Sequence, residues 1–173
     1  RRGVPAVLDP VGMGASRLRV RVTHELVRDV PFAVIRGNAS EILATAGQAA
    51  GGKGVDSSHR SEDALDAART LARVTRAVVC VSGPVDVITD GERVVYVHNG
   101  HPWMPRVTGL GCTATALVGA FLPVADSPFE AAVDAMVVLG VAGELAAENA
   151  KGPGSLQVGI YDALHGLEGD GAQ

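Results

Sequence analysis

The sequence VPAVLDPVGMGAS, residues 4–16, decides the fold class. Its apolar run Val4–Leu8 is typical of a buried strand, and Asp9 ends that run. A glycine-rich loop follows at Val11–Ser16, and the segment Leu18–Val30 then has an apolar residue at every fourth position, which predicts a helix. Open α/β sheets bind ligands where a strand ends and a loop leads into a helix. Taken by itself, an acid in the place of Asp9 is more often a turn or cap residue.

The rest of the chain alternates strands and helices at first and then becomes helical. Further buried strands are predicted at Phe32–Ile35, ended by Arg36 and Gly37, and at Ala77–Val81. Helices are predicted from an N-cap at Asn38 and over Ser61–Arg76. A β-hairpin is predicted from two apolar runs around a turn, and three consecutive helices follow it: the runs are Val85–Thr89 and Arg93–Val97, and the helices are Gly111–Leu122, Ser127–Asn149 and Ser155–Leu167. This order of elements indicates an α/β layered fold with a helical C-terminal block.

Composition restricts the classes of function. The chain has 173 residues, enough for one domain, and 47% of them are hydrophobic, so a core is expected. Fifteen basic and nineteen acidic residues give a net charge of −4, which argues against a nucleic-acid or anionic-membrane partner. The longest uncharged run, Val107–Ala125, contains glycines, threonines and a proline, which suits a loop and a buried helix better than a membrane span. The two cysteines, Cys80 and Cys112, form no disulfide framework, so a reducing cytoplasm is the expected location.

Two readings remain open for Arg36-Gly37-Asn38-Ala39-Ser40-Glu41, which follows the second strand. In the first, Asn38 caps a helix whose first turn is acidic. In the second, Arg36 binds phosphate, and Asn38 and Glu41 surround a magnesium ion, because carboxylates and water suit hard cations.

The segment Thr108-Gly109-Leu110-Gly111-Cys112 carries the sharpest sign of chemistry. Its two glycines allow close approach of the backbone, and an apolar helix follows, so free N–H groups and the positive end of a helix dipole form an anion hole. Cys112 at this helix start is either a reactive residue or a small hydrophobic one.

Several pieces occur in the order found in one known family. They are DPVGMGAS (Asp9–Ser16), IRGNASEI (Ile35–Ile42), GKGVDS (Gly52–Ser57), VSGPVDVITDG (Val81–Gly91), VTGLGC (Val107–Cys112) and KGPGSLQ (Lys151–Gln157). Over Val4–Leu167 the chain resembles the hydroxyethylthiazole kinases of the ribokinase-like superfamily. The resemblance implies a ribokinase-like layered fold with a mostly parallel central sheet. It also implies ATP-dependent, Mg²⁺-dependent phosphorylation of the hydroxyl of 4-methyl-5-(2-hydroxyethyl)thiazole in thiamine biosynthesis or salvage.

The resemblance also implies a role for each matching residue. Cys112 takes the place of the catalytic residue that faces the substrate hydroxyl, and Gly109 that of a substrate-contact residue. The ATP-binding positions are matched by Arg36, Ser82 and Gly111, and the acids near phosphate and magnesium by Asp9 and Glu41.

Members of the family resembled are trimers and carry a further N-terminal segment. The resemblance therefore implies a homotrimer, and it implies that residues 1–173 are the C-terminal major part of one kinase domain and are poorly active alone. Two alternatives to the kinase stay open: a transferase with Cys112 as nucleophile and His101 as the base near it in sequence, and a nucleotide-binding module without catalysis.

Overall fold

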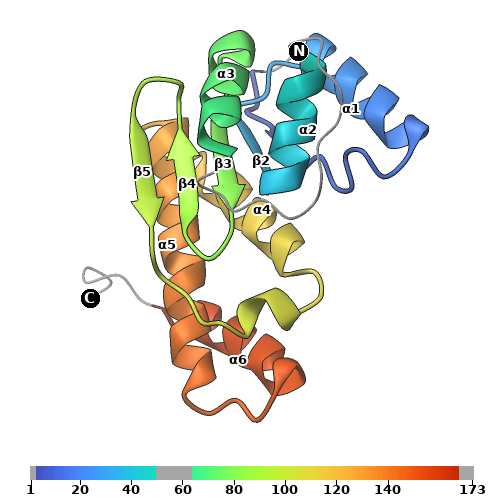
Figure 1. Ribbon diagram of the computed structural model, residues 1–173. Coiled ribbons are helices and arrows are strands. Elements are labelled where there is room, and N and C mark those ends of the chain that lie inside the picture. Colours follow the sequence, from blue (N-terminus) through green and yellow to red (C-terminus); the bar gives the residue numbers. More distant parts are fainter. Residues whose placement is uncertain (1–2, 50–63, 168–173) are drawn as a thin grey trace.

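A five-stranded sheet forms the centre of the computed structural model, which describes residues 3–49 and 64–167 (Figure 1). The strands lie in chain order and are β1 (Val7–Leu8), β2 (Val34–Asn38), β3 (Val78–Ser82), β4 (Asp86–Thr89) and β5 (Val94–Val97). β1, β2 and β3 are mutually parallel, whereas β4 and β5 continue the sheet as an antiparallel hairpin. The carboxyl ends of the three parallel strands therefore meet at one edge of the sheet.

Helices cover both faces of this sheet (Figure 1). They are α1 (Arg17–Asp29), α2 (Ala39–Ala49), α3 (Leu65–Thr75), α4 (Leu110–Phe121), α5 (Pro128–Ala147) and α6 (Pro153–Gly166), with a short 3₁₀ helix at Met104–Arg106. α2 and α3 pack on one face, α4 and α5 pack on the other, and α6 packs on α5.

Alternation along β2 divides the apolar residues between two cores. Val34 packs in the core beneath α4, α5 and α6, and Ile35 packs in the core beneath α2 and α3; both side chains are fully buried. Successive side chains of a strand point to opposite faces, so one strand supplies both layers. Each such side chain contributes about 1.5–3 kcal/mol through removal from water.

The layered α/β fold, the hairpin and the helical C-terminal block are confirmed, and two strand boundaries are corrected. The second strand does not end before Arg36: β2 begins at Val34 and continues through Asn38, because Arg36 and Asn38 pair in register with β3. The first strand is much shorter than Val4–Leu8, because its pairing with β2 starts only at the carbonyl of Ala6. The Gly52–Ser57 motif and the first residues of the predicted helix Ser61–Arg76 lie outside the described residues.

The long uncharged run Val107–Ala125 begins as a loop that ends at Gly109 and continues as helix α4, as its glycines predict. Within residues 3–49 and 64–167, no helix is both long and apolar enough to cross a membrane.

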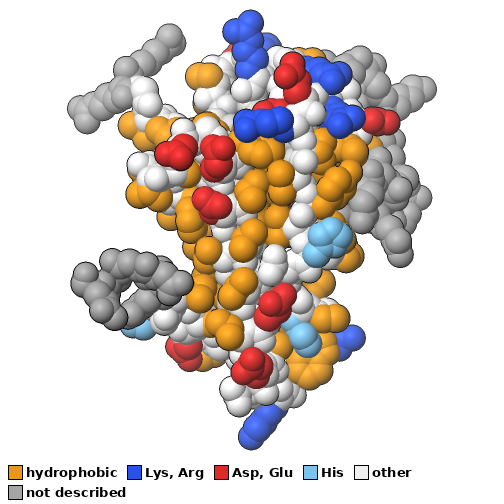
Figure 2. Space-filling model, turned by 90° about the vertical axis from the view of Figure 1, so that its left-hand side faces the viewer, with side chains coloured by type: hydrophobic (Ala, Val, Ile, Leu, Met, Phe, Trp, Pro, Cys, Tyr) orange, Lys and Arg blue, Asp and Glu red, His pale blue; other side chains and the backbone are white. Residues whose placement is uncertain are grey.

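The outer edge of β5 carries apolar side chains at the surface. Figure 2 looks onto this side of the molecule and shows hydrophobic side chains running down its middle, with Lys and Arg side chains gathered at its upper end. Tyr96 of β5 is exposed, and its neighbours Val94 and Val95 are half-buried.

Candidate active site

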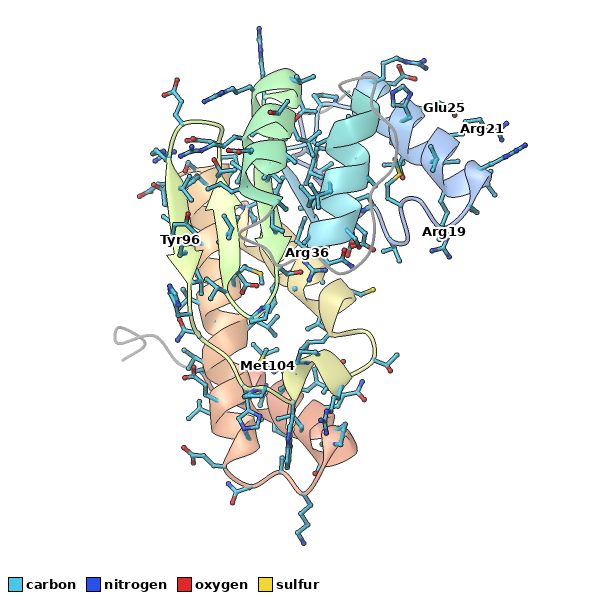
Figure 3. The ribbon with its side chains drawn as sticks, in the orientation of Figure 1. Arg19, Arg21, Glu25, Arg36, Tyr96 and Met104 are labelled. Atoms are coloured by element: carbon cyan, nitrogen blue, oxygen red, sulfur yellow. The ribbon has the colours of Figure 1, made fainter. Side chains whose placement is uncertain are left out.

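Arg36 lies at the centre of a polar cluster at the carboxyl ends of β1, β2 and β3. Its side chain is only 10% exposed, and its Nη2 donates to the hydroxyl of Ser82 at 2.5 Å. Its Nη1 lies 3.5 Å from Oδ2 of Asp9. Figure 3 shows the guanidinium beneath the first turn of α2 and beside the start of α4. A guanidinium has five N–H donors, and its contacts with described residues use two of them, so donors remain for an anion.

The start of α4 presents free backbone N–H groups beside this arginine. Gly109 caps the helix with φ +83°, a backbone conformation that glycine adopts without strain. The amides of Gly111 and Cys112 donate to no residue in the described part of the chain. A Cβ atom on Gly111 would lie 2.8 Å from Nη1 of Arg36, so a side chain here would require the guanidinium to shift. Two free amides, a helix N-terminus and a buried arginine are together suited to bind a polyanion.

Asp9 is held by a residue that sequence reasoning missed. The hydroxyl of Thr115, in α4, donates to Oδ2 of Asp9 at 2.7 Å. The two residues are 106 positions apart, and a threonine inside an apolar helix carries no local pattern that indicates this contact. Only the packing of α4 against β1 brings them together.

Glu41 occupies a capping box at the start of α2. Its amide donates to Oδ1 of Asn38 at 2.9 Å, and its Oε2 accepts from the amide of Asn38 at 3.0 Å. Its Oε1 also accepts from the amide of Gly12 at 2.8 Å, which ties the glycine-rich loop to α2. The reading of Asn38 as a helix cap is thereby confirmed.

Asp9 and Glu41 are carboxylates, the ligands that hard divalent cations prefer, and they do not form a complete metal cage. No group of three or more His, Cys, Asp or Glu side chains suited to a metal occurs among residues 3–49 and 64–167. Mg²⁺ is commonly bound through one or two carboxylates, water and substrate phosphates. Oδ1 of Asp9 accepts no hydrogen bond from a described residue, so it remains available as a ligand.

Cys112 lies in the first turn of α4 with its side chain exposed, and no described residue hydrogen-bonds to its thiol. The candidate base His101 lies in the loop before the 3₁₀ helix, where its Nδ1 accepts from the amide of Trp103 at 3.2 Å. The geometry thus supplies no His101–Cys112 pair of the kind that an activated nucleophile requires. Cys80, in contrast, is fully buried, and burial raises the pKa of its thiol to about 12.

A second buried carboxyl, also missed from the sequence, faces Arg36. Asp86 begins β4, is 8% exposed and accepts from the amide of Gly83 at 2.9 Å, which closes the turn after Ser82. Burial raises the pKa of Asp86 to about 6, while the Gly83 amide and the positive charge of Arg36 oppose this rise.

Comparison with known proteins identifies the family of this chain. Residues 1–170 match the model of the hydroxyethylthiazole kinase family. The chain belongs to the hydroxyethylthiazole kinase family. It is 54% identical over 167 residues to the hydroxyethylthiazole kinase of Oleidesulfovibrio alaskensis, covering 96% of this chain and 63% of that protein. It is also 54% identical over 166 residues to the enzyme of Granulibacter bethesdensis, covering 96% of this chain and 60% of that relative. The chain therefore spans about three fifths of the length of these relatives.

Solved structures agree with this family assignment. The structure of the hydroxyethylthiazole kinase protein of Pyrococcus horikoshii OT3 superposes with a TM-score of 0.85 at 40% identity, covering 96% of this chain and 61% of that one. A Staphylococcus aureus pyridoxal kinase in complex with ADP has a TM-score of 0.60 at 22% identity, over 80% of this chain and 52% of that one, which shows a shared ribokinase-like fold.

The structure brings most of the predicted site residues of this family member together. Arg36 directly contacts Asp9 and Ser82 and lies against Gly111. Gly109 and Cys112 belong to the same helix start as Gly111, and Glu41 joins the glycine-rich loop that follows Asp9. What each of these residues binds stays a prediction.

Proposed function

We propose that this chain carries the phosphoryl-transfer site of an enzyme that phosphorylates the hydroxyl of 4-methyl-5-(2-hydroxyethyl)thiazole with ATP, in thiamine biosynthesis or salvage. The observation that carries the proposal is the buried guanidinium of Arg36 beside the free amides of Gly111 and Cys112. In phosphoryl transfer the protein chiefly positions the reactants and stabilises negative charge, and these groups are suited to that task. Membership of the hydroxyethylthiazole kinase family supports the choice of substrate.

In this mechanism Arg36 binds the phosphate chain of ATP, and the hydrogen bond to Ser82 orients the Arg36 guanidinium. The amides of Gly111 and Cys112 donate hydrogen bonds to the negatively charged phosphoryl group as it is transferred, and Gly109 contacts the thiazole alcohol. As the thiolate, the Cys112 side chain lies beside the acceptor hydroxyl, orients it and takes its proton to become the thiol, while the hydroxyl oxygen bonds to the γ-phosphorus of ATP and ADP leaves. Such a base contributes about 10²–10⁴-fold to the rate.

Asp9 and Glu41 would hold the divalent cation, which we propose to be Mg²⁺. When bound, the ion neutralises charge on the phosphates and fixes their geometry. Glu41 would do so while its two oxygens keep their bonds to the amides of Gly12 and Asn38.

The family of the chain also suggests its oligomeric state and its cellular location. We propose a homotrimer in the cytoplasm. Exposed Tyr96 on the edge strand β5, with hydrophobic side chains on the same side of the molecule, supports a subunit contact, because exposed apolar surface is typical of an interface (Figure 2). Sedimentation equilibrium of the full-length protein tests this assembly, and a monomer at micromolar concentration contradicts it.

The function is tested by mixing the full-length protein with ATP, Mg²⁺ and the thiazole alcohol, and measuring ADP release and the mass of the product. The expected product is the thiazole carrying one phosphate on its hydroxyl. The 5-ethyl analogue, which lacks the hydroxyl, is the matched control and should give no phosphorylated product. ADP release that is the same with both compounds would rule out this acceptor.

A further inference from the structure

Thr115 links the helix that carries the anion hole to the carboxylate at the end of β1. Its hydroxyl lies 2.7 Å from Oδ2 of Asp9, one helical turn beyond Gly111. The other polar contact of Asp9, from Nη1 of Arg36, is much longer at 3.5 Å. Among the described residues, Thr115 therefore makes the shorter hydrogen bond to this carboxylate.

The direction of this bond is informative. A threonine inside a helix usually donates to the carbonyl of the preceding turn, and the carbonyl of Gly111 is available here at 3.2 Å. A hydroxyl has one hydrogen to donate, and the shorter distance places it toward Asp9. A hydrogen bond to an ionised acceptor is stronger than one to a neutral carbonyl, which favours this arrangement.

The contact also fixes the rotation of the carboxylate. With Oδ2 held by Thr115 and approached by Arg36, the plane of the Asp9 carboxyl group is defined by two elements of the fold, α4 and β2. Its other oxygen, Oδ1, accepts no hydrogen bond within the described part of the chain.

We infer that Thr115 is a positioning residue that orients Asp9 so that Oδ1 serves the metal ion bound with the nucleotide. The inference rests on the proposed function, because it requires a metal–nucleotide complex at this site. Residues that hold a metal-binding carboxylate in place typically change metal affinity by 10–100-fold when they are replaced. In this assignment Thr115 contacts Asp9 and neither the metal nor the substrate. Replacing Thr115 should therefore change only the part of the nucleotide affinity that depends on the metal.

The test compares Thr115→Val, which keeps the shape and removes the donor, with Thr115→Ser, which keeps the donor. The full-length proteins are titrated with ADP by calorimetry, once with Mg²⁺ and once with the metal removed by EDTA. We expect Thr115→Val to reduce the Mg²⁺-dependent gain in ADP affinity by about 10-fold. Its affinity for metal-free ADP should be unchanged, and Thr115→Ser should behave as the wild type. The control is Thr70→Val in α3, where the lost hydroxyl donates only to the carbonyl of Asp66 in its own helix.

Each outcome has a defined meaning. If Thr115→Val keeps the full Mg²⁺ effect, or if it weakens both forms of ADP equally, Thr115 has only a structural role and the inference is wrong. If Thr115→Val does not fold, Thr115→Ala is compared with Thr115→Ser in the same titrations. If the wild-type protein binds no ADP and releases none from ATP, the proposed function itself fails. If instead the wild type binds ADP with the full Mg²⁺ effect and Thr115→Val does the same, only the inference about Thr115 fails.

Discussion

Nη2 of Arg36 donates to the hydroxyl of Ser82 at 2.5 Å, across 46 positions of the sequence. The same hydroxyl lies 3.4 Å from the carbonyl of Gly37, to which it can donate. The parallel pairing of β2 with β3 makes this possible, since Asn38 stands opposite Ser82 in the register. The position of the guanidinium is thus determined by the pairing of strands in the sheet.

Replacing Arg36 by alanine should weaken ATP binding by about 10–100-fold, because the charged hydrogen bonds from the guanidinium to phosphate are lost. Lysine should restore only part of the affinity, since it lacks the planar fork of donors. Isothermal calorimetry on the full-length protein measures both effects, and the affinity for the thiazole alcohol should change little. Arg28→Ala is the matched control, because Arg28 is exposed and forms an ion pair with its neighbour Asp29. Unchanged ATP affinity in Arg36→Ala would overturn the assignment.

The buried carboxyl of Asp86 predicts a pH-dependent stability. Its pKa is raised to about 6 in the folded protein, so the folded state retains a proton that the unfolded state releases near pH 4. The contribution of Asp86 to the free energy of unfolding is therefore fully present below pH 4. Up to about 3 kcal/mol of it is lost as the pH rises through 6. Urea unfolding between pH 4.5 and 7.5 should show that Asp86→Asn lacks this loss.

Asparagine preserves the acceptor for the amide of Gly83, so the comparison with Asp86→Asn isolates the charge. Glu92→Gln serves as the control, since Glu92 is exposed in the hairpin turn and its replacement removes one charge without burial. If the stability difference between wild type and Asp86→Asn is the same at every pH, Asp86 does not titrate in this window.

The sequence predicts the layers of this fold well and the partners of its polar groups poorly. Periodicity and glycine-rich loops locate β3, the hairpin and α4–α6 because each depends on local pattern. The position of Arg36 inside β2 depends on pairing with β3, which no local pattern encodes. Thr115 was missed for the same reason, since Asp9 lies at the end of another element, and the burial that raises the pKa of Asp86 likewise depends on the packing of the whole fold. Conversely, the helix start at Gly109–Cys112 was predictable because it lies within one loop and one helix turn.

Gly140 in α5 should not tolerate even a methyl group. A Cβ atom there would lie 2.4 Å from Cβ of Asn99 and 3.0 Å from its backbone carbonyl carbon, so the loop before α4 would have to move. Gly140→Ala should therefore lower the free energy of unfolding by about 1–3 kcal/mol. Gly119→Ala in α4 is the control, since its Cβ would meet only Val7 at 4.0 Å, and alanine should stabilise that helix by about 0.5–1 kcal/mol. Equal stability of the two variants in urea unfolding would show that the contact with Asn99 relaxes freely.

Two substitutions of Cys112, which is exposed in the first turn of α4, distinguish three possible roles of this residue. If its thiolate orients and deprotonates the acceptor hydroxyl, Cys112→Asp should keep or raise activity, because a carboxylate is a suitable base and is stabilised at a helix N-terminus. Cys112→Ala should then lose about 10²-fold or more without a change in melting temperature. A covalent nucleophile predicts that both variants are inactive, and a structural cysteine predicts that alanine is harmless. Steady-state rates and melting curves of the two full-length variants decide between these roles, and near-normal turnover of Cys112→Ala excludes the base.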